Sequence, residues 1–123
     1  MIISPNTNTE VIAATRRADL VSLPGAATPS EAFAALDAGA TALKLFPAEG
    51  ASPAVLKAMR AVLPSDVRVL PVGGITADTL APWLNAGAAG FGLGSALYKP
   101  GRTPAEVAAQ ARRFMEALQA ARA

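Results

Sequence analysis

The chain has 123 residues, of which 52% are hydrophobic and 16% are charged, so its length and composition indicate one compact domain and speak against disorder. It contains no Cys and no His, which excludes thiolate nucleophiles, disulfides, imidazole bases and Cys/His metal sites. The net charge of +2 is too small to indicate nucleic-acid binding, and no membrane span or signal segment is recognisable, so we expect a soluble cytoplasmic protein with no nucleic-acid or membrane partner.

Short apolar runs alternate with longer helical patterns along the chain. The runs cover residues 2–3, 20–23, 42–46, 67–72 and 90–93. This alternation predicts strand–helix units and a parallel sheet of about five strands. The run at 36–40 recurs at 84–88, and the glycine of each copy, Gly39 and Gly87, is predicted to end a helix in the left-handed conformation.

Hydroxyl residues mark the predicted helix starts, because they can accept hydrogen bonds from the free N–H groups of a first turn. These residues are Thr7, Thr28, Ser52, Thr76 and Thr103, and Glu10, Glu31 and Glu106 would complete capping boxes for three of them. The last helix is predicted over residues 104–122. Its apolar stripe is predicted to pack on the core and consists of Val107, Ala111, Phe114, Met115 and Leu118.

Lys44 lies in the middle of a predicted strand. Strand alternation places it on one face with Ala42 and Phe46, and Leu43 and Leu45 on the other face. Apolar surroundings favour the uncharged amine, which can attack a carbonyl and form an imine. The alternative is an edge-strand lysine whose ammonium group reaches water, and the strand alone leaves both interpretations open.

Two glycine-containing loops follow neighbouring predicted strands. Gly73 and Gly74 precede the helix start at Thr76, while Gly94 and Ser95 lead into a short predicted helix over residues 95–99. Exposed backbone N–H groups at such places suit phosphate, and barrels of alternating strands and helices often bind phosphate between their last two loops. A single glycine pair is explained as a turn in most proteins, but the two loops together favour phosphate binding.

Other polar residues near these loops have simpler explanations. Glu49 follows the lysine strand and could approach the same site, but a solvated loop carboxylate is the simpler interpretation. Tyr98 and Lys99 could approach a phosphate or could equally cap a surface helix.

The motifs at 43–49, 23–25, 72–75 and 92–95 together resemble the 2-keto-3-deoxy-6-phosphogluconate (KDPG) aldolase family, over the whole chain and in family order. The ending Gly-Leu-Gly-Ser-x-Leu-Tyr is most similar to the 2-dehydro-3-deoxy-6-phosphogalactonate (KDPGal) branch. The resemblance implies a class I aldolase, a lyase of carbohydrate metabolism in Entner–Doudoroff or galactonate degradation.

In such an enzyme Lys44 would form an imine with the keto carbon of a phosphorylated 2-keto-3-deoxy sugar acid, which is cleaved to pyruvate and glyceraldehyde 3-phosphate. The resemblance further implies that Gly73, Gly74, Gly94 and Ser95 hold the phosphate. Phe46 would border the pyruvyl part, and Val72 would line the same pocket. The resemblance implies no metal or organic cofactor. It implies that the protein assembles as a homotrimer.

Family members form complete eight-stranded barrels, whereas this chain has about five predicted strands. We therefore expect residues 1–123 to form a single partial (β/α)8 TIM-barrel domain that corresponds to strands four to eight. The family's general acid/base glutamate and an arginine come from units with no counterpart here. Five strands cannot close the ring, so we expect association with another chain, a rearranged open sheet or a truncated reading frame.

The leading functional hypothesis is thus an aldolase acting on the 6-phosphogalactonate or 6-phosphogluconate derivative. The alternative is a catalytically impaired barrel fragment that binds phosphorylated ligands or serves in assembly. Another phosphate-binding barrel enzyme, such as an isomerase or synthase, would share the glycine loops but would not need the strand that carries Lys44.

Overall fold

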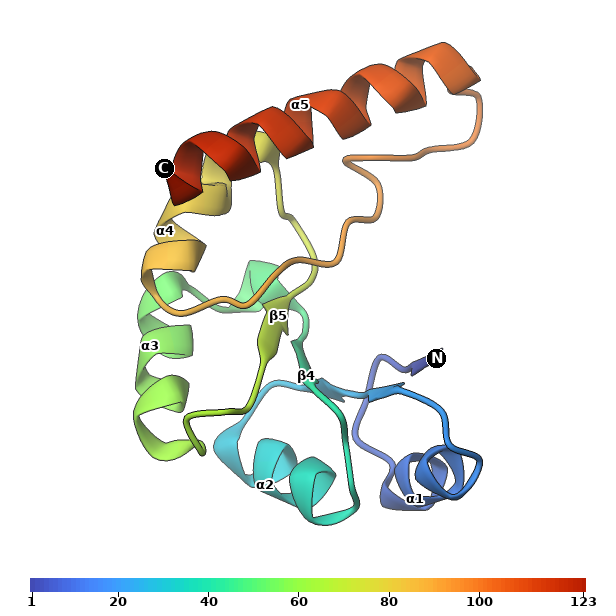
Figure 1. Ribbon diagram of the computed structural model, residues 1–123, viewed down its shortest axis with the longest axis vertical. Helices are drawn as coiled ribbons and strands as arrows, with labels where there is room; N and C mark the ends of the chain where they lie inside the picture. The colour runs from blue at the N-terminus through green and yellow to red at the C-terminus, as the bar shows by residue number, and fades with distance from the viewer.

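A computed structural model describes all of residues 1–123, and the chain forms an arc with the helices on its outer side and the strands on its inner side (Figure 1). The strands are β1 (Ile2–Ile3), β2 (Ser22–Leu23), β3 (Gly25–Ala26), β4 (Leu43–Leu45) and β5 (Val69–Pro71). The helices are α1 (Thr9–Arg17), α2 (Pro29–Asp37), α3 (Pro53–Val62), α4 (Leu80–Asn85) and α5 (Pro104–Arg122), and two short 3-10 helices are η1 (Ala48–Gly50) and η2 (Ala77–Thr79).

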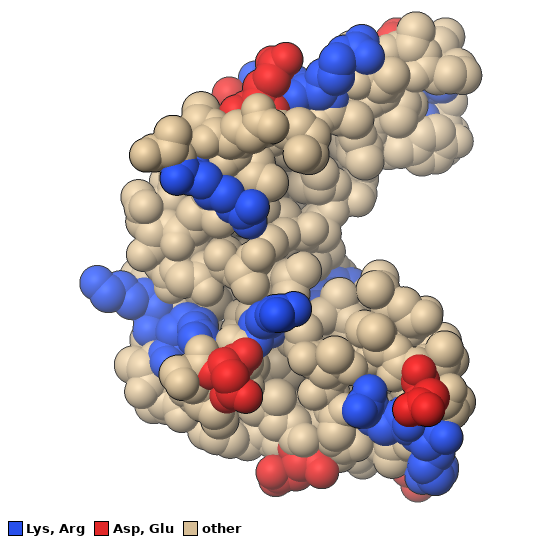
Figure 2. All heavy atoms as spheres, in the orientation of Figure 1, with Lys and Arg blue, Asp and Glu red and all other residues tan.

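All strand pairs are parallel, as the alternating pattern predicts. β1 pairs with β2, β3 and β5 flank β4, and Val72 forms an isolated parallel bridge with Gly92. The strands therefore follow one another in space in chain order, which is the arrangement of successive units in a barrel wall. The wall is open, so the fold is a partial α/β barrel that does not close. Figure 2 shows the side that is hollowed as a consequence.

Two of the predicted strands differ from the observed ones. The run at 20–23 becomes β2, and an additional short strand, β3, follows it after Pro24, which has no N–H to contribute to a ladder. Pro24 still accepts a hydrogen bond from the Lys44 N–H at 2.9 Å, so the chain stays beside β4 across the break. The run at 90–93 is reduced to the single bridge at Gly92, because its glycines form a weak strand with a partner on one side only.

Most of the predicted helix starts are confirmed. The side chains of Thr28, Ser52 and Thr103 accept hydrogen bonds from N–H groups of the first turns, and Glu31 and Glu106 complete capping boxes. Gly39 and Gly87 follow helices with φ of 96° and 98°, as the repeat predicts.

The predicted cap at Thr7 is wrong. Asn8 caps α1 instead, because its Oδ1 accepts hydrogen bonds from the N–H groups of Glu10 and Val11, both at 3.1 Å. The Thr7 hydroxyl donates to the Gly25 carbonyl at 2.7 Å. A Cβ on Gly25 would collide with the backbone of Pro5, so glycine is required where the first connection crosses β3.

The alternation predicted for β4 is confirmed. Leu43 and Leu45 are 1% and 2% exposed and pack into the core with Ile12, Leu56 and Val69, whereas Lys44 lies on the opposite, half-exposed face. Full burial of one such aliphatic side chain contributes about 1.5–3 kcal/mol to folding. This one-sided burial fixes the register of β4 and therefore the direction in which Lys44 points.

Helix α5 has the predicted bounds, but its apolar stripe is less buried than predicted. Phe114 is 6% exposed, whereas Met115 is 55% exposed. Much of α5 extends beyond the strands, so only part of its length has core to pack against (Figure 1). None of the helices combines the length and apolar character that crossing a bilayer requires.

The capping box of α2 leads to a pH-dependent prediction. The pKa of Glu31 lies below its ordinary value, because the carboxylate accepts hydrogen bonds from the Ala27 N–H, the Thr28 hydroxyl and the Thr28 N–H. The unfolded chain protonates this group near the ordinary value of about 4.3. Its contribution to stability is therefore present above that pH and is lost as the pH falls through the lower pKa of the folded state.

We expect Glu31→Gln to reduce the free energy of unfolding at neutral pH and to match the parent chain more closely in acid. Urea denaturation at several pH values measures the difference. Glu116→Gln is the matched control, because Glu116 is exposed and takes part in no ion pair. A Glu31→Gln difference that stays constant down to pH values well below about 4 would contradict this account.

Candidate functional site

A cavity of about 400 Å³ lies at the carboxyl ends of β4 and β5 and beside the bridge at Gly92. Parallel strands bring their following loops to one edge of a sheet, and this is where ligands bind in α/β folds. All the predicted substrate- and phosphate-binding residues line this cavity, namely Phe46, Val72, Gly73, Gly74, Gly94 and Ser95. The remaining lining residues are Glu49, Ile75, Thr76, Gly92, Ala96, Lys99 and Arg102.

The loop after β5 presents free backbone donors to the cavity. Gly73 and Gly74 have φ of 108° and 64°, conformations that favour glycine. The N–H groups of Gly73, Gly74 and Ile75 donate to no carbonyl of the chain. Three consecutive free donors at one wall of a cavity form a backbone site suited to an anion.

Glu49 packs against this loop from the start of η1. A Cβ built on Gly74 would fall 2.6 Å from Cγ of Glu49, and one built on Gly73 would collide with the Glu49 carboxylate. The Ala48 N–H donates to the Val72 carbonyl at 2.9 Å, which holds η1 beside the end of β5. Glu49 is exposed, as expected of a solvated loop carboxylate, and its side chain also lines the wall of the cavity.

The loop after Gly92 forms the second wall. The Leu97 and Tyr98 N–H groups donate to the Gly94 carbonyl at 2.9 and 3.0 Å, whereas the Gly94, Ser95 and Ala96 N–H groups donate to no carbonyl of the chain. The helix predicted over 95–99 is thus a single turn. Pro100 explains the early end, because the residue before a proline is disfavoured in helical conformation.

Gly94 differs from the other cavity glycines. A Cβ at this position would meet no atom within 4 Å, and its φ is not in the positive range. The fold therefore does not require glycine here. The open space in front of Gly94 would allow a ligand to approach the backbone closely.

Lys44 contacts Phe46, which lines the cavity. The lysine is half-buried, its Nζ lies 4.2 Å from the centroid of the Phe46 ring, and the Phe46 side chain lines the cavity. The face of an aromatic ring attracts a cation, so the ring holds the lysine side chain at this edge. Lys44 itself is not among the lining residues.

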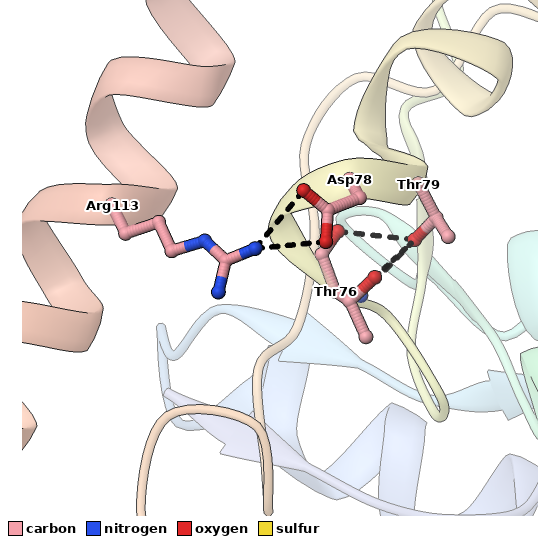
Figure 3. Close-up of polar contacts among 4 residues, drawn as sticks. All are labelled: Thr76, Asp78, Thr79 and Arg113. Carbon is pink, nitrogen blue, oxygen red and sulfur yellow. Dashed lines mark hydrogen bonds and ion pairs between the residues drawn. The ribbon is translucent and has the colours of Figure 1, made fainter.

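Thr76 is held in place on the far side of the double glycine. Its N–H donates to the Thr79 hydroxyl oxygen at 3.0 Å, and the Thr79 hydroxyl donates to the Thr76 carbonyl, also at 3.0 Å (Figure 3). Asp78 in the same turn pairs with Arg113 of α5 at 2.8 Å. Both charged side chains are more than half exposed, so this pair contributes little, about 0–1 kcal/mol.

Arg102 is a cavity residue that the sequence reasoning missed. It lies beyond the loop motifs, and a turn at Gly101, with φ of 90°, returns it to the cavity. The Pro100-Gly101 pair was the available signal for that turn. With Lys99 and Arg102 against Glu49, the side chains around the cavity carry an excess of positive charge, which suits an anionic ligand.

A wider depression of about 600 Å³ lies between the starts of α1 and α2. Its charged residues are Glu10 and Glu31, with no basic side chain. It is therefore less suited to a phosphorylated acid than the cavity at the strand ends.

Comparison with known proteins agrees with this geometry. The family described as "Aldolase: KDPG and KHG aldolase" matches residues 1–111. The 2-dehydro-3-deoxy-6-phosphogalactonate aldolase of Escherichia coli (strain K12) is 47% identical over 121 residues, covering 98% of this chain and 59% of the relative. The chain thus spans less than two thirds of that curated relative.

Solved structures are similar over the same part. "Native KDPGal structure" superimposes with a TM-score of 0.96 at 48% identity, covering 98% of this chain and 58% of the other. A cube-shaped protein cage designed by fusing symmetric oligomeric domains gives a TM-score of 0.96 at 47% identity, covering 98% of this chain and 45% of the other.

The two kinds of cavity glycine should respond differently to alanine. Gly73→Ala should lower the free energy of unfolding by about 1–3 kcal/mol, because the positive φ disfavours a side chain and the Glu49 carboxylate occupies the space of its Cβ. Gly94→Ala should change it by about 0.5 kcal/mol or less. Urea denaturation of both variants measures the contrast, and equal effects would refute it.

Proposed function

Because the chain belongs to the KDPG and KHG aldolase family, we propose that it carries class I aldolase chemistry, with Lys44 as the residue that forms the imine. The proposed substrate is the 2-keto-3-deoxy-6-phospho sugar acid of the galactonate series, or its gluconate epimer. The observation that carries the proposal is the cavity at the ends of β4 and β5, which places Phe46, the neighbour of Lys44, opposite two loops with free N–H groups.

The proposed reaction begins when the neutral amine of Lys44 attacks the C2 keto carbon, water leaves, and the resulting imine takes up a proton from solvent. A base removes the proton of the C4 hydroxyl, the C3–C4 bond breaks, and its electron pair moves into the imine to give an enamine. Glyceraldehyde 3-phosphate leaves as the aldehyde. The enamine then takes up a proton at C3, and hydrolysis releases pyruvate and regenerates Lys44.

The phosphate end of the substrate would lie against Gly73, Gly74, Gly94 and Ser95. The N–H groups at these loops donate to no carbonyl of the chain and would donate to phosphate oxygens. Phe46 and Val72, which line the same cavity, would then border the pyruvyl part. Anchoring the distant phosphate supplies binding energy that can orient the keto carbon toward the lysine.

We further propose that residues 1–123 form one domain corresponding to strands four to eight of the family barrel. The superposition over 98% of this chain and 58% of the solved aldolase structure supports this correspondence. The cytoplasmic location expected from the sequence stays a prediction.

A second candidate function is binding of phosphorylated ligands without turnover. Lys44 does not itself line the cavity that the two loops form, so anion binding can persist without imine formation. The proton transfers at C4 and C3 also require a base and an acid, and such help is typically worth about 10²–10⁴-fold in rate. The two candidates differ in one measurable respect, which is covalent reaction at Lys44.

Borohydride reduction in the presence of pyruvate should label Lys44. The expected result is one reduced adduct, located at Lys44 by peptide mass analysis. Lys57 and Lys99 are internal controls, since they are the other lysines of the chain. Lys44→Ala should abolish the label.

Labelling at Lys57 and Lys99 to the same extent as at Lys44, or no labelling, would reject the imine proposal. A coupled assay of pyruvate release from both phosphorylated epimers then separates turnover from imine formation alone. Imine formation without release of pyruvate would favour the second candidate.

We also propose that the chain associates with copies of itself, as a trimer if the family resemblance extends to assembly. Ile3 on β1 is 57% exposed and Met115 on α5 is 55% exposed, so apolar surface remains uncovered at both ends of the arc. Light scattering should give a mass that is a multiple of 12.4 kDa. A stable monomer at high concentration would refute association.

A further inference from the structure

We propose that Arg102 completes the anion site: one guanidinium nitrogen holds the Gly94–Tyr98 turn in shape, and the remaining N–H groups bind a phosphate oxygen. This inference rests on the proposed function, because it concerns the same cavity. It adds a residue that lies outside both glycine loops.

Arg102 holds the end of the turn that begins at Gly94. Its Nη1 donates to the carbonyls of Ala96 and Leu97, both at 2.9 Å in partly buried hydrogen bonds. Hydrogen bonds from a charged donor contribute more than neutral ones. The turn is therefore fixed at its far end by Arg102, while its first N–H groups remain free at the cavity.

The position of Arg102 follows from a second turn. The Arg102 N–H donates to the Lys99 carbonyl at 3.1 Å, and Gly101 adopts a φ of 90° that favours glycine. This turn reverses the chain directly after Pro100. The guanidinium is therefore placed by local backbone structure and by the carbonyls that it binds.

Arg102 has N–H donors that form no hydrogen bond within the chain. A guanidinium group has five N–H donors in a planar fork, and here Nη1 supplies both hydrogen bonds to the turn. Nε and Nη2 donate to no acceptor of the chain, and Arg102 lines the cavity. The planar fork of arginine matches the oxygens of a phosphate.

Arg102 forms no salt bridge with a carboxylate of the chain. Within ion-pair distance the chain has one salt bridge, between Arg113 and Asp78. The nearby Glu106 carboxylate is occupied by the N–H and hydroxyl of Thr103, at 2.7 and 2.8 Å. A phosphate dianion would therefore be the strongest available partner for this half-buried cation.

The test is titration of the 123-residue chain with inorganic phosphate and with glycerol 3-phosphate, followed by ³¹P NMR. Arg102→Gln should weaken binding of both by about tenfold or more, since it removes a charged donor and the clasp on the turn. Arg112→Gln is the matched control, because it removes the same charge from an exposed position of α5. The control should bind like the parent chain.

Two measurements distinguish direct contact between Arg102 and phosphate from a purely structural role of Arg102. They are the salt dependence of binding and the affinity of Arg102→Lys. If Arg102 contacts phosphate, Arg102→Gln should also reduce the dependence of the affinity on salt, which loosening of the turn alone would not do. Arg102→Lys keeps the charge and should retain more affinity than the glutamine variant. If circular dichroism shows that Arg102→Gln does not fold, the test uses Arg102→Lys instead. This variant is expected to bind phosphate more weakly than the parent chain.

Equal phosphate affinity in the parent chain and the folded Arg102 variants would overturn this inference, and so would no phosphate binding by the parent. Neither result depends on Lys44, because the borohydride reaction with pyruvate uses no phosphate. Conversely, failure of labelling at Lys44 with intact phosphate binding would reject the imine proposal and leave the role of Arg102 standing.

Discussion

The parallel pairing around β4 is the constraint on which the rest of this structure depends. Leu43 and Leu45 are buried on one side of the strand, so Lys44 must point to the other side. The ladder continues past the strand ends, since the Val72 N–H donates to the Leu45 carbonyl at 3.0 Å and the Gly92 N–H donates to the Pro71 carbonyl at 3.1 Å. Loops distant in sequence thereby meet at one edge, and the cavity exists because of this alignment.

The glycines of the cavity differ in whether the fold requires them. Gly73 and Gly74 are needed by the protein itself, because their backbone conformations and the close approach of Glu49 leave no room for side chains. At Gly94, neither the backbone conformation nor a close neighbour requires glycine, since the space around it is open. A glycine that the fold does not require, at a wall of free N–H groups, is more informative about a ligand than one that forms a tight turn.

The sequence predicts those features of the fold and site that depend on local pattern. Period-two alternation placed Lys44 and Phe46 on one face, and hydroxyl–Glu spacing located the starts of α2 and α5. The break at Pro24 and the cap at Asn8 required knowledge of which backbone groups find partners across the chain. The position of Glu49 is tertiary, because it depends on the hydrogen bond from the Ala48 N–H to the Val72 carbonyl, whereas Arg102 is placed by the turn at Gly101 and by carbonyls a few residues away.

The open wall separates two tasks that a complete barrel would combine. The loops proposed to bind the anion, Arg102 and the turn whose carbonyls Arg102 binds all lie within residues 72–102, and their hydrogen bonds are formed within this chain. The proposed imine chemistry needs in addition a neutral amine and a group that moves protons at C4 and C3. Glu49 is the carboxylate on the cavity wall, but it packs on the double glycine, at the end proposed for the phosphate. The proposed anion binding therefore uses groups that this chain supplies, whereas the proposed imine chemistry still needs a group that moves protons.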